Sequence, residues 1–194
     1  MTPAEVESLF RHPEGYRFAR WGRPVVPVAF GVSDETLRVV KGAVEAVVAT
    51  AGHKMADHDP ELGANLMMFF FRDWSELTEV PNLERLIPDI VSFAKGQAKI
   101  GAGVARIFRF DDDGAIKLSI LFLRVDEAVA ESSAHLVMLD QAARSILTWQ
   151  PEAVLVEGGA LRPDVASVLK AAYDPVLPAA ANDNSHALRL AARL

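Results

Sequence analysis

The densest group of side chains that could do chemistry lies between residues 53 and 59. This segment carries His53, Asp57, His58 and Asp59, which supply two imidazoles and two carboxylates. Both kinds of group are ligands of divalent metal ions, so the segment could hold a metal that serves hydrolysis. The spacing matches no specific metal motif, and His, Asp and Gly are also common in solvated turns. A metal site and a solvated loop are therefore both open interpretations, and the loop is the simpler one.

A further imidazole, His135, lies inside a segment with helical periodicity. Zinc peptidases carry the motif His-Glu-x-x-His on such a helix, where the Glu acts as the base. Here Leu136 stands at the Glu position and Leu139 at the second His position, so that chemistry is not encoded. We interpret His135 as a partly buried, hydrogen-bonded side chain. The alternative is an atypical hydrolase site in which it joins the side chains of residues 53–59.

Other motifs have structural explanations. The run Asp111-Asp112-Asp113-Gly114 resembles an acidic calcium loop but lacks its alternating ligands and distal Glu, and a tight hairpin turn accounts for it. There is no cysteine and no Gly-x-Ser-x-Gly elbow, so neither a thiol nucleophile nor that serine nucleophile is expected. A third possibility is an enzyme site assembled from scattered residues such as Arg72, Asp73 and Arg106, because sites are spatial constellations.

One stretch of the chain is similar to a family of bacterial zincin-like domains of unknown function. The resemblance rests on the opening Arg20-Trp21-Gly22-Arg23-Pro24 and on the order of elements that follows it as far as Trp149. It implies that the helix beginning near Asp126 takes the place of a metal-binding helix. Only His135 corresponds to a metal ligand of that helix, and the replacements at the other motif positions speak against peptidase activity.

The composition is that of a packed globular protein. The chain has 194 residues, of which 51% are hydrophobic and 24% charged, and its formal net charge is −6. An acidic surface repels phosphate backbones, so we expect no binding of nucleic acid. No apolar run is long enough to cross a membrane, and the start of the chain does not have the pattern of a secretory signal. We therefore expect a bacterial, cytoplasmic protein.

Hydrophobic periodicity, together with Gly and Pro, predicts the elements that would position these residues. The pattern indicates an α+β fold with the order β-α-β-α-β-β-α-α. Its mixed sheet has about four strands, including a hairpin, and its helices pack mainly on one face. Strands are predicted at 24–30, 65–71, 104–110 and 116–125, and helices at 3–10, 33–51, 83–95 with an interruption at Pro88, 126–149 and 163–174.

We interpret residues 1–175 as a single domain and residues 176–194 as a flexible C-terminal tail, because 177–184 are rich in Ala, Asn and Pro. No complete catalytic constellation is visible. The sequence therefore favours a non-catalytic binding or interaction domain with a protein or small-molecule partner, and it leaves a homodimer open. No cofactor is predicted, and a divalent metal belongs only to the hydrolase alternative.

Overall fold

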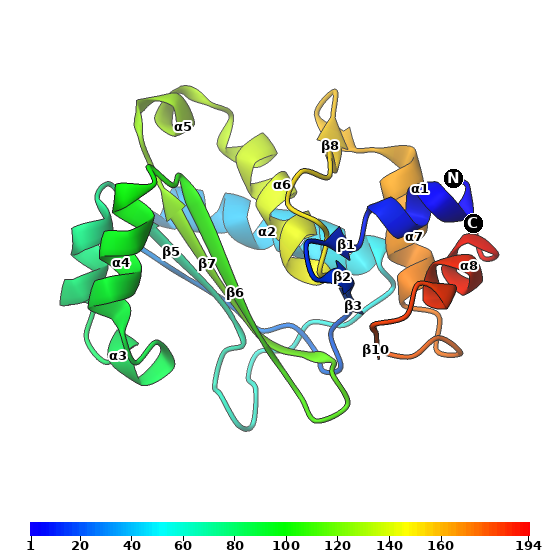
Figure 1. Cartoon of the computed structure of the whole chain (residues 1–194). Coiled ribbons are helices and arrows are strands. Elements are labelled where there is room, and N and C mark those ends of the chain that lie inside the picture. Colours follow the sequence, from blue (N-terminus) through cyan, green and yellow to red (C-terminus); the bar gives the residue numbers. More distant parts are fainter.

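A four-stranded mixed sheet forms the centre of the molecule (Figure 1). The computed structural model describes all residues, 1–194. The strand order is β4 (Pro27–Phe30), β5 (Leu66–Phe71), β7 (Ile116–Arg124) and β6 (Val104–Phe110). Neighbours β4, β5 and β7 run parallel, whereas β6 is antiparallel to β7. The predicted mixed sheet with its hairpin is thus confirmed, and Pro27 lies on an edge strand, where the absence of an amide proton is tolerated.

The central strand β5 is buried on both faces, as its unbroken apolar sequence indicates. Successive side chains of a strand point to opposite faces. Accordingly Leu66, Met68 and Phe70 join a hydrophobic cluster of 37 buried residues on one face, and Phe69 and Phe71 join a cluster of 11 on the other. The sheet therefore separates a large core from a small one.

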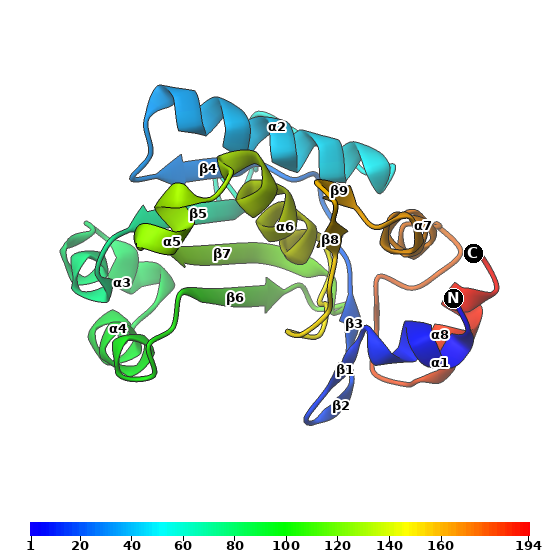
Figure 2. The same cartoon turned by 90° about the horizontal axis from the view of Figure 1, so that it is seen from above.

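The large core lies under α2 (Asp34–Thr50) and α6 (Ala134–Ile146), which run side by side over one face of the sheet (Figure 2). Helix α2 begins where Ser33 accepts a hydrogen bond from the amide of Thr36, the usual role of an N-cap serine. Its buried residues recur at spacings of three and four, as in Val40, Val44 and Val47. Helix α7 (Pro163–Ala172) extends the same core beyond the end of the sheet.

The other face carries a smaller layer, formed by η1 (Trp74–Glu79), α3 (Leu83–Leu86) and α4 (Ile90–Lys99). The indole Nε1 of Trp74 donates to the carbonyl of Ala102 at 2.8 Å, which satisfies a polar atom inside this layer. The predicted break near Pro88 separates α3 from α4. Most of the helical packing lies on one face, as predicted, and the second face is covered as well.

The single long helix predicted for residues 126–149 is wrong, because the structure divides it into α5 (Glu127–Glu131) and α6. Ser132 and Ser133 between them have extended backbones, with ψ angles of 155° and 115°. Serine competes for backbone hydrogen bonds and favours helix ends, which explains a break at this pair. Helix α6 then ends at Ile146, since Leu147 is extended and pairs with Arg20.

Residues 176–194, which we expected to be a flexible tail, pack against the rest of the molecule. Strand β10 (Ala180–Ala181) pairs with β3 (Phe18–Ala19), and α8 (Ser185–Ala191) lies beside α1 (Pro3–Ser8), as Figure 1 shows. Leu177, Ala187 and Leu190 are buried in the large core. Small alanine side chains, which suggested a linker in the sequence, allow this close approach between segments.

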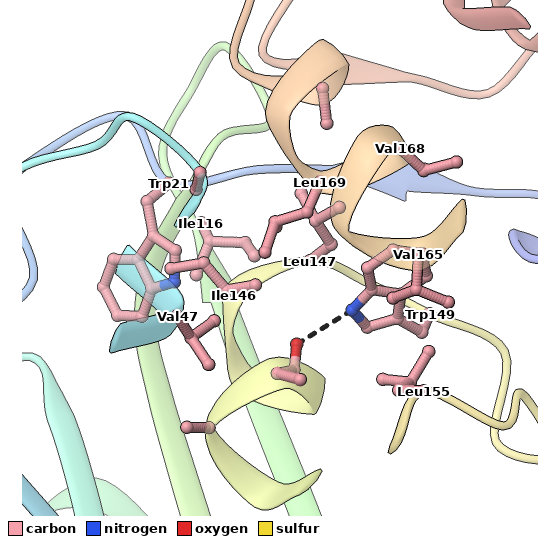
Figure 3. Packing of buried hydrophobic residues seen from close by; sticks show 14 of the residues in the cluster. Trp21, Val47, Ile116, Ile146, Leu147, Trp149, Leu155, Val165, Val168 and Leu169 are labelled. Carbon is pink, nitrogen blue, oxygen red and sulfur yellow. Dashed lines mark hydrogen bonds between the residues drawn. The ribbon is translucent and has the colours of Figure 1, made fainter. Parts of the chain in front are cut away.

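Two short hairpins complete the fold and were not predicted. One joins β1 (Arg11–His12) to β2 (Gly15–Tyr16), and the other joins β8 (Val156–Glu157) to β9 (Ala160–Leu161). Between α6 and β8, Trp149 donates from its indole nitrogen to the carbonyl of Ala143 at 2.8 Å (Figure 3). Its ring stacks on Phe10 at a centroid distance of 5.1 Å. No helix of the structure is long and apolar enough to span a membrane.

Candidate functional site

Of the side chains that the sequence grouped as metal ligands, His53 and Asp59 form hydrogen bonds within the protein, and His58 lines the same cavity as Asp59. His53 is partly buried, and its Nε2 donates to the carbonyl of Arg23 at 2.9 Å. Burial lowers the pKa of His53, and its ring lies 4.8 Å from that of Tyr173. Asp57 and His58 are exposed. His53 thus ties the end of α2 to the segment before β4.

Asp59 is buried and fully engaged in structural hydrogen bonds. It accepts from the amides of Glu61 and Leu62, both at 2.9 Å, and from the side chain of Asn65, also at 2.9 Å. Burial by itself would raise the pKa of Asp59, but these donors and the charge of Arg23 overcome it and lower that pKa to about 2. The carboxylate therefore holds a turn and the start of β5, and little of it remains for a metal.

His135 is exposed in the first turn of α6, which corrects our expectation of a partly buried, hydrogen-bonded side chain in mid-helix. The first residues of α6 and of α2 line one cavity, whereas His53 follows the other end of α2. Helix α2 has 17 residues, and at about 1.5 Å per residue its two ends lie about 25 Å apart. No group of three or more His, Asp or Glu side chains in the structure is placed to hold a metal ion.

The remaining sequence candidates also have structural roles. The turn at 111–114 closes the β6–β7 hairpin, with the amide of Gly114 donating to the carbonyl of Asp111 at 2.9 Å. Asp73 caps η1 by accepting from the amide of Ser75 at 2.8 Å, and Arg72 is exposed beside it. Arg106 instead forms hydrogen bonds to Gln141 and Ser145 on α6, and no hydrogen bond or ion pair links it to Arg72 or Asp73.

The clearest candidate site is a cavity of about 530 Å³ between β6 and α6. A volume of this size suits a small ligand. Strand β6 contributes Arg106, α6 contributes Gln141 and Arg144, and the β1–β2 hairpin contributes His12. Trp149 closes one side. The site is therefore formed by elements that are far apart in the sequence.

Arg106 is a partly buried cation whose protein partners are all neutral. Its Nη2 donates to the side-chain oxygen of Gln141 at 2.6 Å, and its Nε donates to the hydroxyl of Ser145 at 3.2 Å. Its Nη1 makes no hydrogen bond to the protein, and no carboxylate pairs with it. Burial, and then the positive charge of Arg144, lower the pKa of Arg106 to about 10, so the guanidinium stays charged at neutral pH.

The second arginine of the cavity is structural. Arg144 pairs with Asp140 at 2.8 Å and donates to the carbonyls of Pro151 and Ala153 at 3.0 and 2.7 Å. It thus fixes the loop that carries Trp149. His12 donates from Nε2 to the carbonyl of Thr148 at 3.1 Å. This hydrogen bond does not involve Nδ1, the second ring nitrogen of His12. The charge of Arg144 is balanced by Asp140, so Arg106 gives the cavity a net positive charge.

The sequence alone indicates Arg106 only as one of three scattered residues, with Arg72 and Asp73. Its position in the strand sequence VARIFRF is a clearer signal. Arg106 lies two residues from both Val104 and Phe108, so the three side chains point to the same face of the sheet. An arginine on the core-facing side of a strand requires a partner. Comparison of the chain with known protein families, curated proteins and solved structures found no match.

Proposed function

We propose that this protein is a non-catalytic binding domain that recognises an anionic group, carboxylate or phosphate, in the cavity between β6 and α6. The observation that carries this proposal is the guanidinium of Arg106, which is partly buried and has only neutral partners. A buried charge is costly unless an opposite charge compensates it. An anionic ligand would supply the missing charge.

The donors of the site suit such a ligand. Arginine has five N–H donors in a planar fork, which matches the geometry of carboxylate and phosphate oxygens. Hydrogen bonds of Nε and Nη2 orient the fork of Arg106 and leave Nη1 for the ligand. The flat wall of Trp149 and the imidazole of His12 flank the same space. The arrangement binds and orients a ligand without supplying a nucleophile placed against it.

The test is titration with phosphate and with citrate, followed by calorimetry and by amide chemical shifts. We expect binding that weakens as salt rises and that shifts resonances of β6 and α6. Arg106→Gln should weaken binding at least tenfold. Gln141→Glu should do the same, because it places a carboxylate on Arg106 at the position where Gln141 Oε1 now accepts at 2.6 Å.

Gln141→Glu also separates loss of binding from loss of fold, since its internal ion pair should leave the melting temperature unchanged or raised. The matched control is Gln97→Glu on α4, which makes the same chemical change on the opposite face of the sheet. It should leave the affinity unchanged. Citrate and phosphate binding that survives both cavity substitutions would overturn the proposal.

A further inference from the structure

The outer edge of β6, which borders the cavity, is an unpaired strand edge. Strand β6 ends the sheet and pairs with β7 alone. The carbonyl of Gly103 accepts from the amide of Arg124 at 2.8 Å, so the peptide groups of residue 103 face β7. Peptide groups of an antiparallel strand alternate between its two sides. The N–H and C=O groups of Val104, Arg106 and Phe108 therefore point outward, where another strand could pair with them; the carbonyl of Phe108 now accepts only a long hydrogen bond, from Nη1 of the exposed Arg109 at 3.5 Å.

The opposite edge of the sheet is protected, and the edge at β6 is less so. Strand β4 has only four residues and begins with Pro27, and short strands and proline both discourage pairing. Strand β6 has seven residues and no proline. An exposed charge such as Arg109 is a common form of protection on an edge. Arg106 does not act in this way, because its side chain turns to Gln141 and Ser145 on α6.

The edge is positively charged, although the molecule as a whole is acidic. Arg17, Arg106 and Arg109 form no ion pair with any carboxylate of the chain. The guanidinium of Arg17 lies over the ring of Phe110, 5.1 Å from its centroid, at the far end of β6. The net charge of the whole chain is −6. The positive charge lies along β6 itself, because the exposed Asp112 and Asp113 follow in the turn beyond Phe110. The strand therefore attracts acidic groups from outside, while most of the surface repels them.

We infer that an extended, acidic peptide segment of another protein adds to β6 as a fifth strand and places one of its carboxylates on Arg106. This inference rests on the proposed function, because it uses the same cationic cavity. Backbone hydrogen bonds to Val104, Arg106 and Phe108 hold the peptide, and the carboxylate sets its register. A second copy of this chain fits less well, since β6 against β6 sets arginines against arginines.

The test uses an acetylated octapeptide of alternating valine and glutamate, titrated against the full chain and followed by amide chemical shifts. Val104→Pro removes an outward N–H at the first residue of β6, where proline is tolerated, and should weaken binding at least tenfold. The matched control Val104→Ala shortens the side chain to a methyl group but keeps the N–H. Because Val104 is 40% exposed, this change should alter the affinity less than threefold. Arg106→Gln should also weaken binding at least tenfold.

Peptide variants keep the test decisive if Val104→Pro fails to fold. N-methylation of the peptide at one set of alternate residues should abolish binding, and methylation of the other set should leave it unchanged. If methylation of either set of alternate residues weakened binding equally, the inference would be overturned. Binding of an oligothymidylate as tight as that of the peptide would overturn it too. So would a doubling of the mass in solution that depends on Val104. Citrate binding at Arg106 without these strand effects would leave the proposed function intact and overturn only the inference about β6. If neither citrate nor the peptide binds, the proposed function and the inference are both wrong.

Discussion

His186 is a fully buried imidazole that holds α8 against the N-terminal segment. Its Nδ1 shares a hydrogen bond of 2.8 Å with the hydroxyl of Tyr16, and its ring lies 4.2 Å from that of Phe18. Its Nε2 is buried without a partner. Burial, and then the charges of Arg189 and Arg193, lower the pKa of His186 to about 4. The folded state therefore requires the neutral imidazole.

This pKa predicts how stability depends on pH. Because the folded pKa lies below the ordinary value of 6.5, the contribution of His186 is fully present above pH 6.5 and is lost as pH falls toward 4. Urea unfolding at a series of pH values should show this loss. His186→Leu combined with Tyr16→Phe should remove it, and an unchanged pH slope in the double variant would contradict the assignment.

The pair itself should behave as a unit. Tyr16→Phe leaves Nδ1 of the buried His186 without its partner and should cost about 1–2 kcal/mol of unfolding free energy. The double variant Tyr16→Phe with His186→Leu removes both polar groups, so it should be less destabilised than the sum of the two single variants. Chemical denaturation measures all three. Strict additivity would mean that the hydrogen bond contributes nothing.

The loop of residues 53–59 gives a prediction about metals. Because His53 and Asp59 are committed to structural hydrogen bonds, added zinc or manganese should leave the melting temperature unchanged. Thermal melts at one equivalent of metal and at tenfold excess test this. A rise that disappears in His58→Ala would instead support the hydrolase alternative. A rise that disappears in His135→Ala would support it too, because that alternative includes His135, on α6, among its ligands.

Two glycines around α2 should respond oppositely to the same substitution. Gly42 lies exposed within α2 with no atom near the position of an added Cβ, so Gly42→Ala should stabilise by about 0.5–1 kcal/mol. Gly31, between β4 and α2, has a φ of +79°, and its Cβ would lie 2.1 Å from the carbonyl oxygen of Phe70. Gly31→Ala should therefore destabilise strongly, and thermal melts compare the pair.

The sequence predicted those elements whose signal is local. Helix α2, the strand β5 and the β6–β7 hairpin follow from spacing, capping and turn residues within each segment. The break at Ser132 and Ser133 was missed because the apolar stripe continues across it. The site was missed for another reason: Arg106 and Gln141 meet only in the folded chain, 35 residues apart. No local pattern marks such a pair.

Helix α8 is part of the core of the molecule, so substitutions on its buried face and on its exposed face should differ in their effect on stability. Leu190 is fully buried, so Leu190→Ala should lower the free energy of unfolding by about 2–5 kcal/mol. Leu188, on the same helix, is 58% exposed, and Leu188→Ala should change the unfolding free energy by less than about 0.5 kcal/mol. Equal, small effects in denaturation experiments would restore the view of residues 176–194 as a loose tail.

The contact between Tyr16 and His186 also constrains how the protein is made. The two residues are 170 positions apart, and a ribosome adds about 5–20 residues per second, so Tyr16 waits roughly 9–34 s for its partner. During that time the aromatic side chains of Phe10, Tyr16 and Phe18 lack the helix that covers them. The aromatic cluster around Tyr16 is thus completed only after the 170-residue stretch up to His186 has been synthesised.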